Sequence, residues 1–267
     1  MESCMKKKII FVEGSDYVGK TTFIDKFILL LNSEGLKALR IVEPNGEYRK
    51  ILMSKGNKLS IQGRKFLFAA NHIDTMYKIA KEYDNYDYIL IDRTALISDF
   101  IYNTSDNELN EYLERFAGMY EDLDLTKFNN LFLNNSMTLF LAVTPSIFES
   151  RLQARKVKIS DYYDSKTEDF KRNICRKYNA MYSYILSEIG DKEDIPSMLD
   201  CNYELTSSDK AFIKEHILRK NEKVLSNRYI NNKSHANIVF KIFKDEDKDK
   251  INKDIIKLYE DIRQGGN

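Results

Sequence analysis

The sequence predicts an α/β protein in which about five parallel strands are wrapped by helices. Short apolar runs of strand length alternate along the chain with longer stretches whose apolar residues recur every three or four positions. The first apolar run, residues 9–12, leads directly into the segment Gly14-Ser15-Asp16-Tyr17-Val18-Gly19-Lys20-Thr21. Such alternation is typical of a parallel sheet covered by helices. We therefore expect a single α/β domain over residues 1–267.

Most of the predicted strands are aliphatic runs without polar alternation, as expected where both faces of a sheet are buried. The run at residues 9–12 reads Ile-Ile-Phe-Val, and the run at 88–91 reads Tyr-Ile-Leu-Ile. The other three predicted strands are residues 36–42, 138–143 and 238–243.

Amphipathic periodicity predicts a helix after most strands. Residues 22–31 place Phe23, Phe27 and Leu31 on one side, and Gly35 marks the end of this helix. Further helices are predicted at residues 59–83, 108–119, 148–155, 168–189 and 251–262. The polar stretch 190–237 is predicted to be an insertion before the last strand. Within it, a helix is predicted at residues 210–225.

Charge and composition exclude several classes of partner. The 42 basic and 41 acidic residues nearly cancel, so no overall field favours nucleic acid. No apolar run approaches the roughly 18 residues that a membrane-spanning helix needs. The three cysteines form no C-x-x-C pair, which favours a reducing compartment. We expect a cytoplasmic protein, in the host cytoplasm if the AT-rich residue usage reflects a phage genome.

The glycine-rich segment matches the pattern G-x-x-x-x-G-K-[ST] between a strand and a helix, where it binds nucleotide phosphates. Backbone N–H groups and the helix N-terminus would attract the phosphates of ATP, and Lys20 would reach the β- and γ-phosphates. The Thr21 hydroxyl would ligate Mg²⁺. The predicted ATP-binding residues are Gly14, Ser15, Asp16, Tyr17, Val18, Gly19, Lys20, Thr21 and Thr22.

Asp92 and Arg93 follow the third strand, at the edge where open α/β sheets bind ligands. The carboxylate could hold Mg²⁺ together with Thr21, and the arginine could neutralise charge during phosphoryl transfer. The alternative interpretation is a solvated ion pair at the end of a strand.

Four motifs in register resemble those of thymidylate kinases. Residues 13–22 are similar to the first motif of that family, and Glu43-Pro44-Asn45-Gly46 to its Glu-Pro-Gly-Gly turn. The segment Leu67-Phe68-Ala69-Ala70-Asn71-His72 resembles the family's Leu-Phe-Ala-Ala-Asp/Asn-Arg helix. Asp92-Arg93 resembles the family's Asp-Arg-Tyr motif. The resemblance covers residues 7 to about 189, and we extend it to the final strand and helix.

This resemblance implies a P-loop kinase fold and transfer of the ATP γ-phosphoryl group to a deoxynucleoside 5′-monophosphate, with dTMP as the leading acceptor. It implies a lid at about residues 155–166, ATP and Mg²⁺ as cofactors, nucleotides as small-molecule partners, and a homodimer. The polar stretch at about 190–237 is then an insertion before the last strand. The implied catalytic residues are Lys20, Asp92, Arg93 and Arg155. Arg151 and Arg155 match arginines at the entrance to the family's lid, where closure can deliver positive charge to the transferred group. The implied acceptor-binding residues are Asp16, Glu43, Arg49, Phe68, Asn71, His72 and Arg93.

Four departures from the family pattern leave the acceptor base open. Val42 replaces the arginine before Glu-Pro, and neither Arg40 nor Arg49 is in register with it. His72 replaces an arginine that reads the base, and Thr94 replaces the tyrosine of the Asp-Arg-Tyr motif. Tyr17 stands where one branch of the family has a P-loop arginine and the other has a small residue. Two alternatives stay open. One is a deoxynucleoside kinase with Glu43 as general base. The other is a catalytically degraded nucleotide-binding protein.

Overall fold

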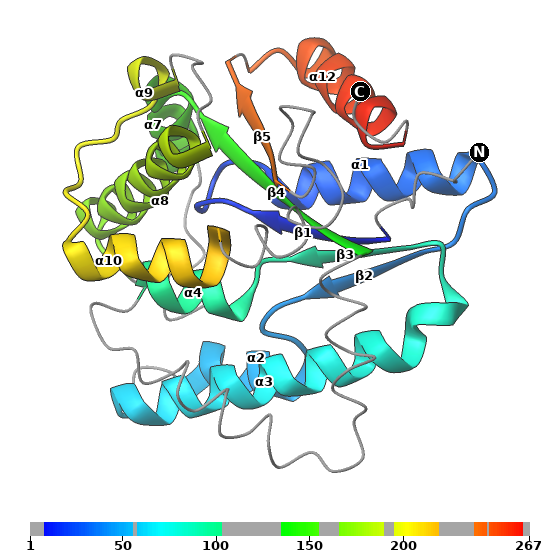
Figure 1. Ribbon diagram of the computed structural model, residues 1–267, viewed down its shortest axis with the longest axis horizontal. Helices are drawn as coiled ribbons and strands as arrows, with labels where there is room; N and C mark the ends of the chain where they lie inside the picture. Colours follow the sequence, from blue (N-terminus) through cyan, green and yellow to red (C-terminus); the bar gives the residue numbers. More distant parts are fainter. Residues whose placement is uncertain are drawn as a thin grey trace.

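Five parallel strands form a single sheet in the order β2-β3-β1-β4-β5 (Figure 1). The computed structural model describes residues 8–55, 58–102, 135–154, 166–189, 195–218, 238–244 and 246–263. The strands are β1 (Ile9–Glu13), β2 (Ala38–Val42), β3 (Tyr88–Asp92), β4 (Ser136–Val143) and β5 (Ile238–Phe243). The five predicted strands and the parallel α/β fold are therefore confirmed.

Helices cover both faces of this sheet. They are α1 (Lys20–Ser33), α2 (Gly46–Lys55), α3 (Ile61–Glu82) with the short η2 (Tyr83–Asn85), α4 (Ala95–Tyr102), α7 (Pro145–Ala154), α8 (Glu168–Ile189) and α12 (Lys248–Arg263). The sequence did not predict α2 and α4. Helix α2 begins inside the turn signal that follows β2, and the sequence of α4 is apolar at most positions, so it shows no clear amphipathic periodicity. The helix predicted at residues 108–119 lies outside the described residues.

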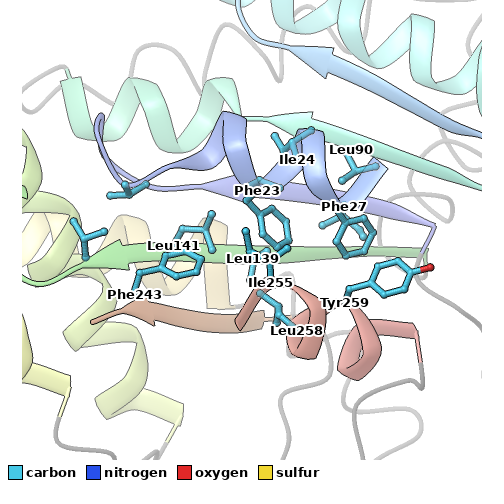
Figure 2. Close-up of a cluster of buried hydrophobic side chains, with 14 of the residues drawn as sticks. Phe23, Ile24, Phe27, Leu90, Leu139, Leu141, Phe243, Ile255, Leu258 and Tyr259 are labelled. Atoms are coloured by element: carbon cyan, nitrogen blue, oxygen red, sulfur yellow. The ribbon is translucent and has the colours of Figure 1, made fainter. Parts of the chain in front are cut away.

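One face of the sheet is covered by α1 and α12, which pack against each other and on β4 (Figure 2). Phe27 of α1 meets Tyr259 of α12 with ring centroids 5.0 Å apart. Phe23 and Ile24 are fully buried in the same cluster. This packing fixes α1, and therefore fixes the loop that precedes it.

Two further clusters cover the opposite face. Ile79 of α3 packs on isoleucines of β1, β2 and β3. Helices α4 and α8 pack on β4 and β5, where Tyr178 and Met181 are fully buried. Both faces of every central strand are thus occupied, which explains why the strands read as continuous apolar runs.

The described part of the predicted insertion contains three helical segments. It contains α9 (Ile195–Met198), α10 (Ser207–Phe212) and a π-helical continuation, η3 (Ile213–Leu218). Helix α10 begins three residues before the predicted 210–225 helix, because Thr206 and Asp209 form a capping box at its N-terminus. Residues 155–165 of the expected lid lie outside the described part of the chain. No helix among the described residues is long and apolar enough to cross a membrane.

Candidate active site

A cavity of about 1100 Å³ opens at the carboxyl ends of the strands. The segments that follow β1, β2 and β3 all contribute side chains to it, as expected for an open α/β sheet. The C-terminal region adds Phe243, Glu246, Lys248, Ile251 and Ile255. One space therefore joins motifs that are far apart in the sequence.

The glycine-rich loop connects β1 to α1 and follows the main-chain path that its glycines allow. Gly14 has φ +150°, and a Cβ atom there would lie 2.5 Å from the Leu141 carbonyl oxygen. Gly19 has φ +96°, and Tyr17 also adopts a positive φ of 70°. A larger residue at position 14 would collide with β4, so the loop depends on glycine there.

Lys20 is the first residue of α1, and its side chain folds back over the loop. Its Nζ donates hydrogen bonds of 2.8 Å to the carbonyl oxygens of Gly14 and Ser15. The residue is only 7% exposed, and burial lowers the pKa of its ammonium group to about 8, helped by the nearby Arg93 charge. A polyphosphate beside this ammonium would stabilise its charged form.

Thr21 and Asp92 are the two predicted magnesium ligands, and the structure brings them together. The Thr21 hydroxyl donates to Asp92 Oδ2 over 3.4 Å, and both residues line the cavity. A hydroxyl and a carboxylate are the oxygen donors that Mg²⁺ prefers, so the pair fits this ion. Arg40 also donates to Asp92 Oδ2 at 3.4 Å, and at 2.5 Å to Asp25 of α1.

Asp16, Arg93 and Tyr102 form a hydrogen-bonded triangle across the cavity. Arg93 donates to Asp16 and, over 3.0 Å, to the Tyr102 hydroxyl. That hydroxyl donates in turn to Asp16 Oδ2 over 3.2 Å. Arg93 has a φ of 77°, so its main chain turns sharply as it leaves β3. The triangle fixes the guanidinium beside the phosphate-binding loop.

Glu13 is a fully buried carboxyl group at the end of β1, next to Arg93 and Thr94. It accepts a hydrogen bond from the Thr94 main-chain N–H and another, of 3.4 Å, from the Tyr178 hydroxyl. Burial raises the pKa of Glu13 to about 7, against the lowering effect of the Thr94 hydrogen bonds and the Arg93 charge. Glu13 thereby links the end of β1 to the segment after β3.

Helix α3 and the turn after β2 form the other side of the cavity. Phe68, Glu43 and Arg49 line it. Glu43 is 5% exposed, with Oε1 3.3 Å from His72 Nδ1 and Oε2 buried without a protein partner. Asn71 is fully buried, and its Oδ1 accepts a 2.8 Å hydrogen bond from the Asn45 N–H. The Glu43–Pro44 peptide bond of this turn is cis.

The structure places most of the predicted site residues around the cavity. Those that line it are Asp16, Tyr17, Val18, Gly19, Lys20, Thr21, Thr22, Glu43, Arg49, Phe68, Asp92 and Arg93. Gly14, Ser15, Asn71 and His72 lie behind this lining, where His72 and Asn71 hold Glu43 and the turn. Arg155 lies outside the described residues.

Tyr102 and Ser98 line the cavity but were not predicted from the sequence, whereas Arg40 and Arg151 had been considered for phosphate contacts. Tyr102 lies ten positions after Asp92 in a helix that was not predicted, and Ser98 one turn before it. Arg40 has the same side-chain direction on β2 as Val42, because strand side chains repeat every two residues. Arg151 donates to the Tyr17 carbonyl over 2.8 Å and so lies against the phosphate-binding loop.

Comparison with known proteins agrees with this geometry. The thymidylate kinase family model matches residues 12–189, about two thirds of the chain. A search of curated proteins found no match. The matched residues include the phosphate-binding loop, the Glu43 turn, α3 and Asp92-Arg93. With a P-loop kinase fold and one cavity shared by these motifs, the chain belongs to the thymidylate kinase family and is a nucleoside monophosphate kinase.

Proposed function

We propose that the chain transfers the γ-phosphoryl group of ATP to dTMP, with Mg²⁺, giving ADP and the nucleoside diphosphate. The observation that carries this proposal is the single cavity in which Lys20 and Phe68 face the same space. Its volume of about 1100 Å³ exceeds that of a typical pocket for one small ligand and suits two nucleotides.

The donor side is the loop from Gly14 to Thr22. Its main-chain N–H groups and the N-terminus of α1 would bind the ATP phosphates. Lys20 would exchange its two carbonyl partners for phosphate oxygens, which are stronger acceptors because they are charged. Thr21 and Asp92 would hold Mg²⁺, which would offset phosphate charge during the transfer.

On the acceptor side, Arg93 would bind the acceptor phosphate, and Asp16 would lie close to the sugar of the acceptor. An oxygen of the acceptor phosphate would attack the γ-phosphorus of ATP, and the bond from that phosphorus to the β–γ bridging oxygen would break. Arg93 would neutralise charge on the transferred group, since its guanidinium is already fixed by Asp16 and Tyr102. Phe68 would stack on the base, a contact that contributes about 1–3 kcal/mol.

Polar groups near Phe68 support thymine as the base. Thymine presents one N–H group between two carbonyl oxygens. The His72 ring, whose Nδ1 lies 3.3 Å from Glu43 Oε1, can donate a hydrogen bond to one of these oxygens once the base is bound. His72 occupies the position of the family arginine that reads the thymine edge, and its ring keeps a hydrogen-bond donor there, which is the reason for favouring dTMP.

The test is ADP release from ATP and Mg²⁺ with each of the four deoxynucleoside monophosphates and the four free deoxynucleosides. We expect dTMP to give the highest kcat/KM. Preference for another monophosphate would contradict the thymine assignment alone. Activity on free nucleosides only would favour a nucleoside kinase in which Glu43 accepts the 5′-hydroxyl proton. Binding of ATP without turnover of any acceptor would indicate a degraded, nucleotide-binding relative.

A further inference from the structure

The segment Ile195–Leu218 lies outside the residues matched by the family model, yet it packs on helices that are inside it. Figure 1 shows α10 beside α4 and α8. The segment contributes five buried residues to the cluster that contains α4 and α8: Leu199, Leu205, Ile213, Ile217 and Leu218. It is therefore an integral part of the hydrophobic core.

Helix α4 is the element through which this segment can influence the active site. Ser98 and Tyr102 of α4 line the cavity, and Tyr102 closes the triangle with Asp16 and Arg93. Tyr102 is also the last residue of α4. Its hydroxyl can hold Asp16 and Arg93 only if the C-terminal turn of α4 stays in place.

A buried lysine of α8 ties that turn to the segment. Lys177 is 3% exposed, and its Nζ donates a 2.7 Å hydrogen bond to the Phe100 carbonyl. The same ammonium lies 4.5 Å from the centre of the Phe100 ring. Carbonyl groups in the last turn of a helix lack partners within the helix, and a cation there also interacts favourably with the helix dipole.

Two residues of α10 complete the connection. Asp209 Oδ1 lies 3.9 Å from Lys177 Nζ, and the Asp209 side chain is 12% exposed, so a carboxylate balances the buried ammonium. Phe212 stacks on Phe100 with ring centroids 4.7 Å apart and an interplanar angle of 3°. The last turn of α4 is thus held between α8 and α10.

We propose that Ile195–Leu218 is a brace that positions Tyr102, with Asp209 and Phe212 as positioning residues that act through Lys177 and Phe100. None of the cavity-lining residues comes from this segment, so its described part does not cover the acceptor. The proposal rests on the proposed function in one respect, namely that Tyr102, Asp16 and Arg93 serve the acceptor nucleotide.

The kinetic test compares Asp209→Asn and Phe212→Ala with a matched control, Lys214→Ala. Lys214 belongs to the same segment, but its 3.0 Å ion pair with Glu188 lies on the surface. We expect the acceptor KM to rise about fivefold or more in both test variants, with the ATP KM within about twofold of wild type. The control should match wild type. Equal increases in both KM values, or no increase, would overturn the proposal.

Hydrogen exchange provides a readout that does not depend on turnover. Peptides covering Ala95–Tyr102 should exchange faster in Asp209→Asn than in wild type or Lys214→Ala, and unchanged exchange would refute the brace. This measurement stands even if no acceptor is phosphorylated, so failure of the proposed function can be told apart from failure of the brace. If Asp209→Asn does not fold, Lys177→Met is the second variant. It removes the ammonium that Asp209 balances and keeps a side chain of similar length.

Discussion

Arg40 donates to Asp92 Oδ2 over 3.4 Å, so the carboxylate predicted to bind Mg²⁺ already has a cation beside it. Arg40 also pairs with Asp25, and its Nε is buried without a protein partner. The family arginine would stand at Val42, two residues further along the same strand face. The guanidinium of Arg40 therefore lies beside the carboxylate that is predicted to bind Mg²⁺.

Replacing Arg40 with methionine should strengthen magnesium binding. Without the guanidinium, Asp25 and Asp92 lose the cation between them, and the site becomes more negative by one charge. At an effective dielectric constant of about 20, charges this close interact by a few kcal/mol, so we expect the Mn²⁺ dissociation constant to fall about fivefold or more. Electron paramagnetic resonance of Mn²⁺ with the ADP complex measures it. Arg40→Lys is the control, and a weaker ion affinity in Arg40→Met would contradict the prediction.

Lys20 should take up a proton when ATP binds above pH 8. In the free enzyme its pKa is lowered to about 8 by burial, so part of the population is neutral at pH 8.5. Phosphate charge raises that pKa, and the neutral fraction becomes protonated. Calorimetry in two buffers with different ionisation enthalpies measures this proton, which should vanish in Lys20→Ala.

The Lys20→Ala variant should also lose turnover while the protein stays folded. Lys20 is predicted to contact the transferred phosphoryl group, so we expect kcat to fall about a thousandfold or more in Lys20→Ala. The protein should remain folded, because loss of the two hydrogen bonds to Gly14 and Ser15 is offset by removal of a desolvated charge. Near-normal turnover in a folded Lys20→Ala protein would refute the assigned phosphate role.

Phe68→Ala should weaken binding of the acceptor without affecting ATP. Loss of a stacking contact of about 1–3 kcal/mol corresponds to an increase in acceptor KM of roughly 5- to 150-fold. Phe66 of the same helix is 44% exposed and does not line the cavity, so Phe66→Ala is a matched control. Steady-state kinetics with each nucleotide varied in turn separates the two KM values. An equal effect of both substitutions would mean that Phe68 acts only through the fold.

The sequence was sufficient for the features that depend on local pattern. The strands and the phosphate-binding loop follow from apolar runs and glycine spacing, and α8 was predicted with the bounds that the structure has. Tyr102 was missed because it reaches Asp16 only through the three-dimensional position of α4, which Lys177 and Phe212 hold from distant parts of the chain. From the sequence, Arg40 could be compared only with the family arginine position at Val42, with which it is not in register. Its contacts in the structure are with Asp25 of α1 and Asp92 of β3, which the sequence pattern does not indicate.

Glu13 should make the stability of the protein depend on pH between about 4.5 and 7. Burial raises its pKa from 4.5 to about 7, so over this range the unfolded chain is ionised at Glu13 while the folded chain keeps the proton. The free energy of unfolding therefore falls as pH rises, by on the order of 3 kcal/mol, and levels off above pH 7. Glu13→Gln can still accept the Thr94 hydrogen bond but cannot titrate. Urea unfolding at pH 5, 6, 7 and 8 should show that the free energy of unfolding of Glu13→Gln, relative to wild type, increases up to pH 7 and then stays constant. A constant difference between the two proteins would mean that Glu13 is already ionised in the folded state at pH 5.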